Sequence, residues 1–243
     1  MRPLAYDLHL HSCLSPCGDE EMTPNSIAGM GKLNGLSILA LTDHNTTANA
    51  AAFYAACQRY GIVPIAGAEL TTAEDIHLVS LFPTLEAALD FDADLAPYRI
   101  AVPNRPEIFG HQLLVDENDM VLGERVELLT NALSLSLDEA AAFAGRYGAV
   151  CYPAHIDRES NGAVAVLGAF PHESGFTCYE LASQTNLKAY ESRYALSGLL
   201  PIVSSDAHVL WNISEGENTL LLSGESEAEL RAELLTLLKG GGA

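Results

Sequence analysis

The chain has 243 residues, and 32 Asp and Glu against 12 Lys and Arg give it a formal net charge of −20 at pH 7. Such an acidic surface repels long polyanions, so we expect no stable complex with long nucleic acid. The hydrophobic content of 49% and the charged content of 18% exclude a disordered chain and are typical of a globular protein. The length suits one domain, which we expect over residues 1–243.

Features of secreted and membrane proteins are absent from the sequence. No early stretch combines a basic segment, an apolar run and a small-residue cleavage site, and no apolar run is long enough to span a bilayer. We therefore expect a cytoplasmic protein without a membrane partner. The cysteines are odd in number and scattered, which favours free thiols over a disulfide framework. They are Cys13, Cys17, Cys57, Cys151 and Cys178.

The first predicted strand, residues 6–12, carries two histidines at alternate positions. Because side chains i and i+2 of a strand point the same way, His9 and His11 project together. Two neutral imidazoles from one strand can bind one ion of the Zn, Fe or Mn type. Two polar residues on an exposed strand face would give the same pattern, so the rest of the chain decides between these interpretations.

Apolar runs and helical segments then alternate along the chain. Strands are predicted at 36–41, 62–68, 76–82, 149–152, 177–181, 200–204 and 217–222. Helices are predicted at 23–34, 47–60, 85–95, 137–147 and 226–238, with Thr23, Ser136 and Ser226 as N-caps and Gly61 as a helix end. The alternation predicts an α/β fold in which parallel strands are joined by helical crossovers, either covered on both faces or closed into a barrel.

The alternation breaks between about residues 84 and 135. Within this stretch, residues 112–121 resemble two short strands around an acidic turn at 116–119. The stretch has few apolar residues for a core of its own. We interpret it as a subdomain inserted into the barrel between the fourth and fifth strands.

Imidazoles and carboxylates gather where the predicted strands end. The C-terminal strand ends of a parallel β/α barrel form one face, and that face carries the active site. Histidine and carboxylate without a cysteine quartet are typical of a catalytic metal site with open coordination positions. The candidate metal-binding residues on these strand ends are His9, His11, Asp43, His44, Glu69, His77, His155, Asp206 and His208.

One acidic residue near the middle of this set, Glu69, could bridge two ions. Bridged metals about 3.5–4 Å apart suit in-line displacement at phosphorus, because they stabilise both the attacking and the leaving oxygen. A divalent ion also makes water a usable nucleophile near neutral pH. We take Glu69, Asp206 and His208 as the candidate catalytic residues.

These motifs resemble those of the PHP (polymerase and histidinol phosphatase) family, and the resemblance spans nearly the whole chain. The matching segments are His9-Leu10-His11, Thr42-Asp43-His44, Glu69, Pro153-Ala154-His155 and Ser205-Asp206-Ala207-His208. The resemblance implies a distorted seven-stranded (β/α) barrel that holds two or three divalent ions, Zn, Fe or Mn. It implies a first ion on His9, His11, Glu69 and Asp206, a second on Glu69, His77 and His155, and a third on His44 and His208 with a ligand from the first loop.

The first loop departs from the family pattern. Many members of the family place a His or Asp a few residues after the paired histidines, whereas here the loop is longer and offers Asp19, Glu20 or Cys17. We favour Asp19, because a carboxylate suits Fe, Mn and Zn and Gly18 lets the loop turn. Cys17 as a thiolate would bias the site towards zinc.

Four residues in or beside this set have two interpretations each. His77 is either a ligand or a hydrogen-bonded core histidine, and Asp43 either binds an ion or orients a histidine. Glu180 lies within a predicted strand, so a supporting role is expected rather than direct ligation. Arg158 follows His155 closely and either clamps a substrate phosphate through its guanidinium or forms a surface ion pair.

The leading interpretation is a metal-dependent phosphoesterase that hydrolyses a small phosphomonoester, histidinol phosphate among them, or a short nucleotide or oligonucleotide. One alternative is an amidohydrolase-type metal hydrolase, which often uses a carboxylated lysine at a strand end. The only lysines are Lys32, Lys188 and Lys239, and none lies at such an end. The other alternative is a non-catalytic, metal-binding regulatory domain. The sequence contains no signal for the oligomeric state.

Overall fold

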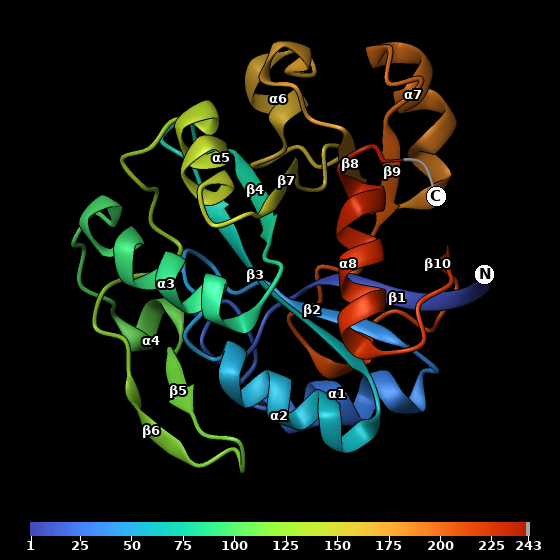
Figure 1. Cartoon of the computed structure of the whole chain (residues 1–243). Helices are drawn as coiled ribbons and strands as arrows, with labels where there is room; N and C mark the ends of the chain where they lie inside the picture. Colours follow the sequence, from blue (N-terminus) through green and yellow to red (C-terminus); the bar gives the residue numbers. More distant parts are fainter. Residues whose placement is uncertain (242–243) are drawn as a thin grey trace.

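A curled half-barrel sheet forms the centre of the computed structural model, which describes residues 1–241 (Figure 1). Its strand order is β10-β1-β2-β3-β4-β7. The bounds are β1 (Arg2–Leu10), β2 (Ile38–Leu41), β3 (Val63–Thr71), β4 (His77–Leu81), β7 (Val150–Pro153) and β10 (Thr219–Leu222). The fold is therefore of the mixed α/β class, as the sequence predicts.

Eight α-helices surround the sheet within the described residues. They are α1 (Pro24–Leu33), α2 (Ala50–Tyr60), α3 (Leu85–Leu95), α4 (Pro106–Phe109), α5 (Leu137–Gly145), α6 (Ala163–Leu167), α7 (Leu187–Tyr194) and α8 (Glu227–Leu238). The predicted N-caps are confirmed: the side chains of Thr23, Ser136 and Ser226 each accept a backbone N–H of the first helical turn. Gly61 ends α2 in the left-handed conformation that its missing Cβ permits. None of these helices has the length and apolar content needed to cross a membrane.

The prediction that the strands are all parallel is wrong for two of them. β1, β2 and β3 are parallel, but β4 runs antiparallel to both β3 and β7, and β10 runs antiparallel to β1. Only residues 72–76 join β3 to β4, which is too short for a crossover helix and therefore makes a hairpin. As a result, the start of β4 lies at the same rim of the sheet as the C-terminal ends of β1, β2 and β3.

A separate parallel pair, β8 (Cys178–Leu181) and β9 (Leu200–Val203), continues the curl beside β7. The backbone N–H of Ile156, just after β7, donates to the carbonyl of Glu180 in β8. At the other end, Ala207 after β9 forms an isolated parallel bridge with Leu10. Among residues 1–241 no continuous ladder joins the pair to the six-stranded sheet, so the closed seven-stranded barrel stays a prediction.

The predicted insertion contains α3, α4 and a hairpin of β5 (Leu113–Val115) and β6 (Val121–Glu124) that extends away from the sheet (Figure 1). The segment is tied to the rim by Asn45, whose side-chain amide donates to the carbonyls of Leu129 and Asn131. It also supports the loop after β1, because Leu113 N–H donates to the Cys13 carbonyl at 2.8 Å.

Two apolar clusters cover the two faces of the curled sheet. The inner cluster lies in the concave side, where Leu8, Ile65 and Tyr152 pack with Leu230 and Leu234 of α8. The outer cluster lies between the sheet and helices α1, α2, α3 and α5. Because both faces of the sheet are covered by apolar side chains, the polar side chains of the strands gather at the rim formed by the C-terminal ends of β1, β2 and β3.

Candidate metal centre

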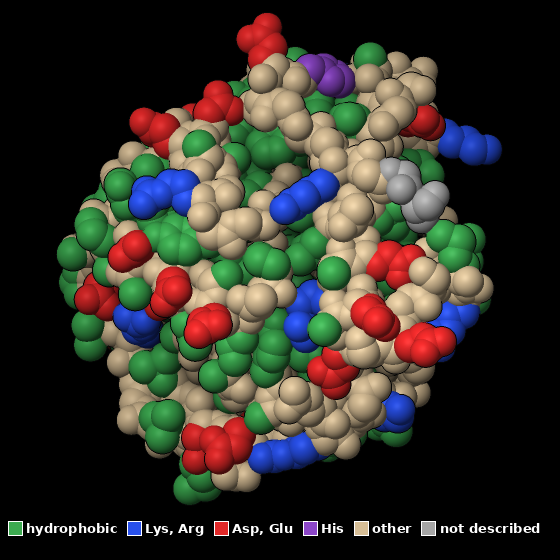
Figure 2. Space-filling model, viewed as in Figure 1, with side chains coloured by type: hydrophobic (Ala, Val, Ile, Leu, Met, Phe, Trp, Pro, Cys, Tyr) green, Lys and Arg blue, Asp and Glu red, His purple; other side chains and the backbone are tan. Residues whose placement is uncertain are grey.

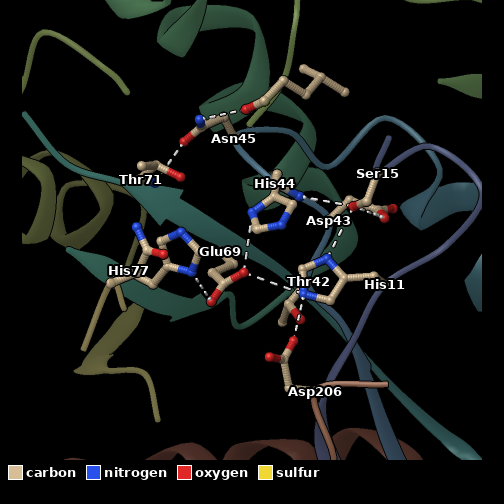
Figure 3. A network of polar contacts seen from close by, with 12 residues as sticks. His11, Ser15, Thr42, Asp43, His44, Asn45, Glu69, Thr71, His77 and Asp206 are labelled. Atoms are coloured by element: carbon tan, nitrogen blue, oxygen red, sulfur yellow. Dashed lines mark hydrogen bonds and ion pairs between the residues drawn. The ribbon is translucent and has the colours of Figure 1, made fainter. Parts of the chain in front are cut away.

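Six imidazoles and two carboxylates meet at this rim. Figure 3 shows four of them, His11, His44, His77 and Asp206, around Glu69. The six imidazoles and two carboxylates come from β1 and its end (His9, His11), the segment after β2 (His44), β3 (Glu69), the start of β4 (His77), and the segments after β7 (His155) and β9 (Asp206, His208). All except His77 and His208 are buried. The hairpin explains how His77 joins the set: Thr71 pairs with His77 and Glu69 with Val79, so Glu69 and His77 are diagonal neighbours on one face.

The nitrogens and oxygens form three overlapping clusters, in each of which the donor atoms lie within 4.8 Å of one another. The clusters are His9, His11, Glu69 and Asp206; His44, Glu69 and His77; and His11, His44 and His208. The first is the set that the family resemblance implies for the first ion.

Glu69 is the hub of the arrangement. Its Oε1 lies 2.8 Å from His77 Nδ1, 3.0 Å from His155 Nε2 and 3.2 Å from His9 Nε2. Its Oε2 lies 3.1 Å from His44 Nδ1 and 3.3 Å from His11 Nε2. Each carboxylate oxygen thus contacts its own group of imidazoles, and Glu69 stays the candidate bridge between two cations.

Several of these close atoms make no hydrogen bond. Nδ1 of His44, Nδ1 of His77 and Oδ1 of Asp206 are buried without a hydrogen-bond partner among the described residues. Yet His77 Nδ1 lies 2.8 Å from Glu69, and Asp206 Oδ1 lies 3.0 Å from His11 Nε2. These atoms are therefore close to other donor atoms without being satisfied by them. Buried polar atoms without partners are costly, so this geometry fits divalent ions held by histidine and carboxylate.

Burial and opposite charge act against each other on the groups of this cluster. Burial alone would raise the pKa of Glu69, but the imidazoles of His77 and His9 hold it well below its usual range. Burial alone would lower the pKa of His11, but the carboxylates of Asp206 and Glu69 raise it to about 9. Burial lowers the pKa of His44 and lowers that of His208 to about 4, so both rings are neutral at pH 7 and can bind a cation.

Two outer carboxylates orient the histidines. Glu180 Oε1 accepts a hydrogen bond from His9 Nδ1 at 2.9 Å and another from the backbone N–H of His155 at 3.1 Å. This is the supporting role expected for Glu180, and it leaves His9 Nε2 free for an ion. Asp43 accepts from the hydroxyls of Ser12 and Ser15, both at 2.7 Å, and Ser15 Oγ lies 3.0 Å from His11 Nδ1. Asp43 is in none of the three clusters, so this geometry supports its orienting interpretation.

The backbone is unusual at two of the candidate ligands. His155 and Asp206 have φ values of 27° and 50°, in a region that residues with a Cβ seldom occupy. In this conformation the Asp206 carbonyl accepts a hydrogen bond from His208 Nδ1 at 2.8 Å. The β1–β2 register also shifts between Asp7 and Leu10, around His9. These departures from regular strand geometry aim side chains at the rim.

The first loop does not bring its predicted ligand into the clusters. Asp19 is exposed, and its carboxylate accepts the backbone N–H of Glu21 at 2.8 Å. Glu20 and Cys17 are exposed as well. None of these three belongs to the clusters found among the described residues. The choice among them stays a prediction.

A cavity of about 100 Å³ opens onto the cluster. Arg158 lines it and forms an ion pair with Asp206 Oδ2. Sequence reasoning selected Arg158 but missed Ser160 and Asn161, which line the same cavity. In the sequence, Ser160 and Asn161 stand out only because they follow His155 in a short loop. Their position in the sequence does not predict which way either side chain points.

A curled α/β sheet with a buried rim of histidine and carboxylate is typical of metal-dependent hydrolases. The chain belongs to the PHP domain family, whose sequence profile matches residues 7–164. The family resemblance seen in the motifs is thereby confirmed.

Related proteins share parts of this chain. An error-prone DNA polymerase from Symbiobacterium thermophilum is 42% identical over 74 residues, which are 30% of this chain and 7% of the polymerase. The lesion-specific endonuclease EndoQ from Pyrococcus furiosus is similar in structure, with a TM-score of 0.65 and 18% identity over 99% of this chain and 57% of the endonuclease. An inferred metal-dependent phosphoesterase from Bifidobacterium adolescentis gives a TM-score of 0.58 and 18% identity over 97% of both chains.

Proposed function

We propose that the protein is a metal-dependent phosphoesterase that hydrolyses a small phosphomonoester or a short nucleotide. The observation that supports this most is the convergence of unpartnered, buried donor atoms around Glu69, with a guanidinium at the mouth of the same cavity. Membership of the PHP family and structural likeness to an endonuclease and an inferred phosphoesterase support a hydrolase of phosphate esters.

The donor set can be divided so that each imidazole serves one ion and only Glu69 is shared. The first ion would be held by His9, His11, Asp206 and Glu69, which form one of the three clusters. The second would be held by Glu69, His77 and His155, because the two imidazoles lie 2.8 and 3.0 Å from the same oxygen of Glu69. His44 and His208 remain for a third ion, with a first-loop ligand such as Asp19. Imidazole and carboxylate donors suit Zn, Fe or Mn.

Bound divalent ions would stabilise charge on the phosphate and provide a water-derived nucleophile at neutral pH. The chain's own groups do the rest. Glu69 and Asp206 neutralise part of the cationic charge, and Glu180 keeps His9 in the tautomer with Nε2 free. His208 lies at the mouth, with Nδ1 engaged by a carbonyl and a side chain 27% exposed. Arg158 is placed to bind a non-bridging phosphate oxygen.

Elemental analysis and a phosphate-release panel test this function together. The gently purified protein should contain at least two divalent ions per chain. With added Mn or Zn it should release phosphate from one or more of mononucleotides, dinucleotides, sugar phosphates and histidinol phosphate. A reproducible content below one ion per chain would rule out the multinuclear site. Bound ions without hydrolysis of any ester would favour a non-catalytic metal-binding domain.

A further inference from the structure

We propose that a groove beside the β3–β4 hairpin binds a small organic cation, a protonated amine or guanidine that carries an apolar body. The groove lies between residues 74–76 and the start of α5 on one side and residues 167–174 on the other, and it is here called the hairpin groove. None of its lining residues is a candidate metal ligand, so the inference goes beyond the proposed phosphoesterase function and does not rest on it.

The hairpin groove is separate from the metal centre. Ile76 lines the groove, whereas His77, the next residue, lines the cavity at the metal centre. Because successive side chains of an extended strand point to opposite sides, the start of β4 forms a wall between the two. A ligand in the groove therefore takes none of the space that the ions need. The groove has a volume of about 480 Å³, within the roughly 300–1,000 Å³ of sites that enclose small molecules.

The floor of the hairpin groove is apolar. Ile76, Leu137 and Phe170 form it, and all three are buried in the outer apolar cluster. At the edge of the floor, Leu167 is 46% exposed, so part of the apolar lining is in contact with water. An apolar body that covers Leu167 removes apolar surface from water on both partners, which favours binding. The groove thus suits an organic ligand rather than a bare ion.

Three exposed carboxylates surround this floor. They belong to Glu74 of the hairpin, Asp138 in the first turn of α5, and Glu173 in the segment after α6. Among the described residues, no Lys or Arg lines the groove. The ion pairs that Lys and Arg form within residues 1–241 go to Asp92 and Asp206 instead. Because the three carboxylates have no Lys or Arg beside them in this part of the chain, their combined field favours a cation over an anion or a neutral molecule.

Acidic side chains alone would not mark a site in this protein. In Figure 2 they are scattered over the visible face, with Lys and Arg side chains standing singly among them. The hairpin groove differs because its carboxylates surround a cavity with an apolar floor. That combination requires a ligand with two parts, a positive group for the rim and an apolar body for the floor.

The wall on the hairpin side of the groove is already ordered. Both oxygens of Glu74 accept the Leu137 N–H, at 3.2 and 3.0 Å, and the Ala73 N–H donates to the Leu135 carbonyl at 2.7 Å. These contacts join the hairpin to the start of α5. An ordered wall loses less conformational freedom when a ligand binds than a free loop does, so less of the interaction energy is lost.

His172 offers a hydrogen-bond acceptor on the opposite wall. Its Nε2 donates to the Tyr194 carbonyl at 2.8 Å, and its ring packs edge-on against Phe170 with the ring centroids 4.9 Å apart. With the proton on Nε2, the neutral ring leaves Nδ1 to accept an N–H of an ammonium or guanidinium group. The positive group of the ligand can therefore be bound by a hydrogen bond as well as by charge.

Tryptamine is the probe for this site, because it combines an ammonium group with an indole ring. Isothermal titration calorimetry with the metal-loaded protein compares it with tryptophol, which lacks the charge, indole-3-propionate, which reverses it, and ethylamine, which lacks the apolar body. We expect one tryptamine site per chain, affinity at least about tenfold weaker for tryptophol and ethylamine, and no binding of indole-3-propionate. The affinity for tryptamine should fall as the salt concentration rises, because salt screens exposed charges.

Three variants locate the probe. Glu74→Gln and Asp138→Asn should each weaken tryptamine binding by about two- to fivefold, the range of an exposed ion pair. Leu167→Ala should weaken it as well, because the ligand then covers less apolar surface. The matched controls are Glu86→Gln, in the first turn of α3, and Leu33→Ala, at an exposed leucine of α1. Neither residue lines the groove, so both variants should bind tryptamine like the parent.

The outcomes decide the inference without reference to catalysis. Asp138→Asn and Leu167→Ala change exposed side chains, so they keep the test open if Glu74→Gln, which alters the contact with α5, folds poorly. Equal affinity for tryptamine and tryptophol would overturn the selection of a cation. Parental affinity in Asp138→Asn and Leu167→Ala, or no binding at millimolar tryptamine, would overturn the site itself. None of these results depends on phosphate release, so failure of the proposed function would leave the inference standing.

Discussion

Replacing Glu180 by Gln should weaken metal binding without unfolding the protein. Gln keeps the carbonyl-type oxygen that accepts from His9 Nδ1 and from the His155 N–H, so both hydrogen bonds can persist. In the parent protein the negative charge of Glu180 makes the His9 imidazole a stronger ligand, and the substitution removes this charge. Changes to such outer partners typically cost about 10–100-fold in metal affinity, or about 1.4–2.8 kcal/mol.

Replacing Glu180 by Ala should have a second effect of a different kind. It leaves two buried donors without acceptors, at about 1–3 kcal/mol each in the free energy of unfolding, in addition to the loss of metal affinity. Chelator competition measures the affinity, and denaturant unfolding of ion-free protein measures the stability. Glu173→Gln is the matched control, since Glu173 is exposed on the surface.

The two variants together can refute the orienting role. If Glu180→Gln binds ions like the parent, the charge of Glu180 does not tune His9. If Glu180→Ala has the parent's stability in the ion-free state, the two hydrogen bonds do not hold His9 and His155 in place.

Three further outcomes are expected. Glu69→Gln should lower phosphate release by orders of magnitude while the fold survives in circular dichroism, because a neutral amide cannot attract two cations; parental activity at unchanged metal content would show that Glu69 is no bridge. Asp43→Asn should lower activity or metal affinity by about 10–100-fold, measured at matched total metal. If Asp43 were a direct ligand, the same substitution would instead lower the metal content by one ion per chain in elemental analysis. Removal of ions by a chelator should lower the thermal midpoint reversibly, since ions that bind only the folded state stabilise it; an unchanged midpoint would mean that the site holds no ion tightly.

The candidate site was more accessible to sequence reasoning than the fold around it. His9 and His11 were predictable as a pair from strand periodicity, and the structure brings their Nε2 atoms to 3.2 Å from each other. The direction of β4 was not predictable from its apolar run, because a buried run has the same composition in either direction. His77 therefore joins the rim for a reason that differs from the predicted one: it starts an antiparallel strand instead of lying in a parallel one.

Side-chain partners bear on one residue that the sequence left open, Asp43. Asp43 follows a strand, as a ligand would, but the serines at positions 12 and 15 take up its carboxylate. That contact joins two loops distant in sequence, so no local pattern encodes it. Ser160 and Asn161 were not predicted because a short polar loop has no periodicity, and only the three-dimensional path of the loop turns them to the cavity.

The order in which the centre forms depends on where its ligands lie along the chain. Glu69 and His77 belong to one hairpin and can meet early, since hairpins form from local contacts. His9 and His11, in contrast, need Asp206, and the bridge between Leu10 and Ala207 holds them together across almost the whole sequence. A chain still being synthesised would therefore offer His9 and His11 unpaired to cellular metals for most of its elongation. We expect the site of His9 and His11 to select its ion only after β9 has docked and brought Asp206 to the two histidines. From then on, the coordination geometry of the complete site, rather than raw affinity, can discriminate between metals.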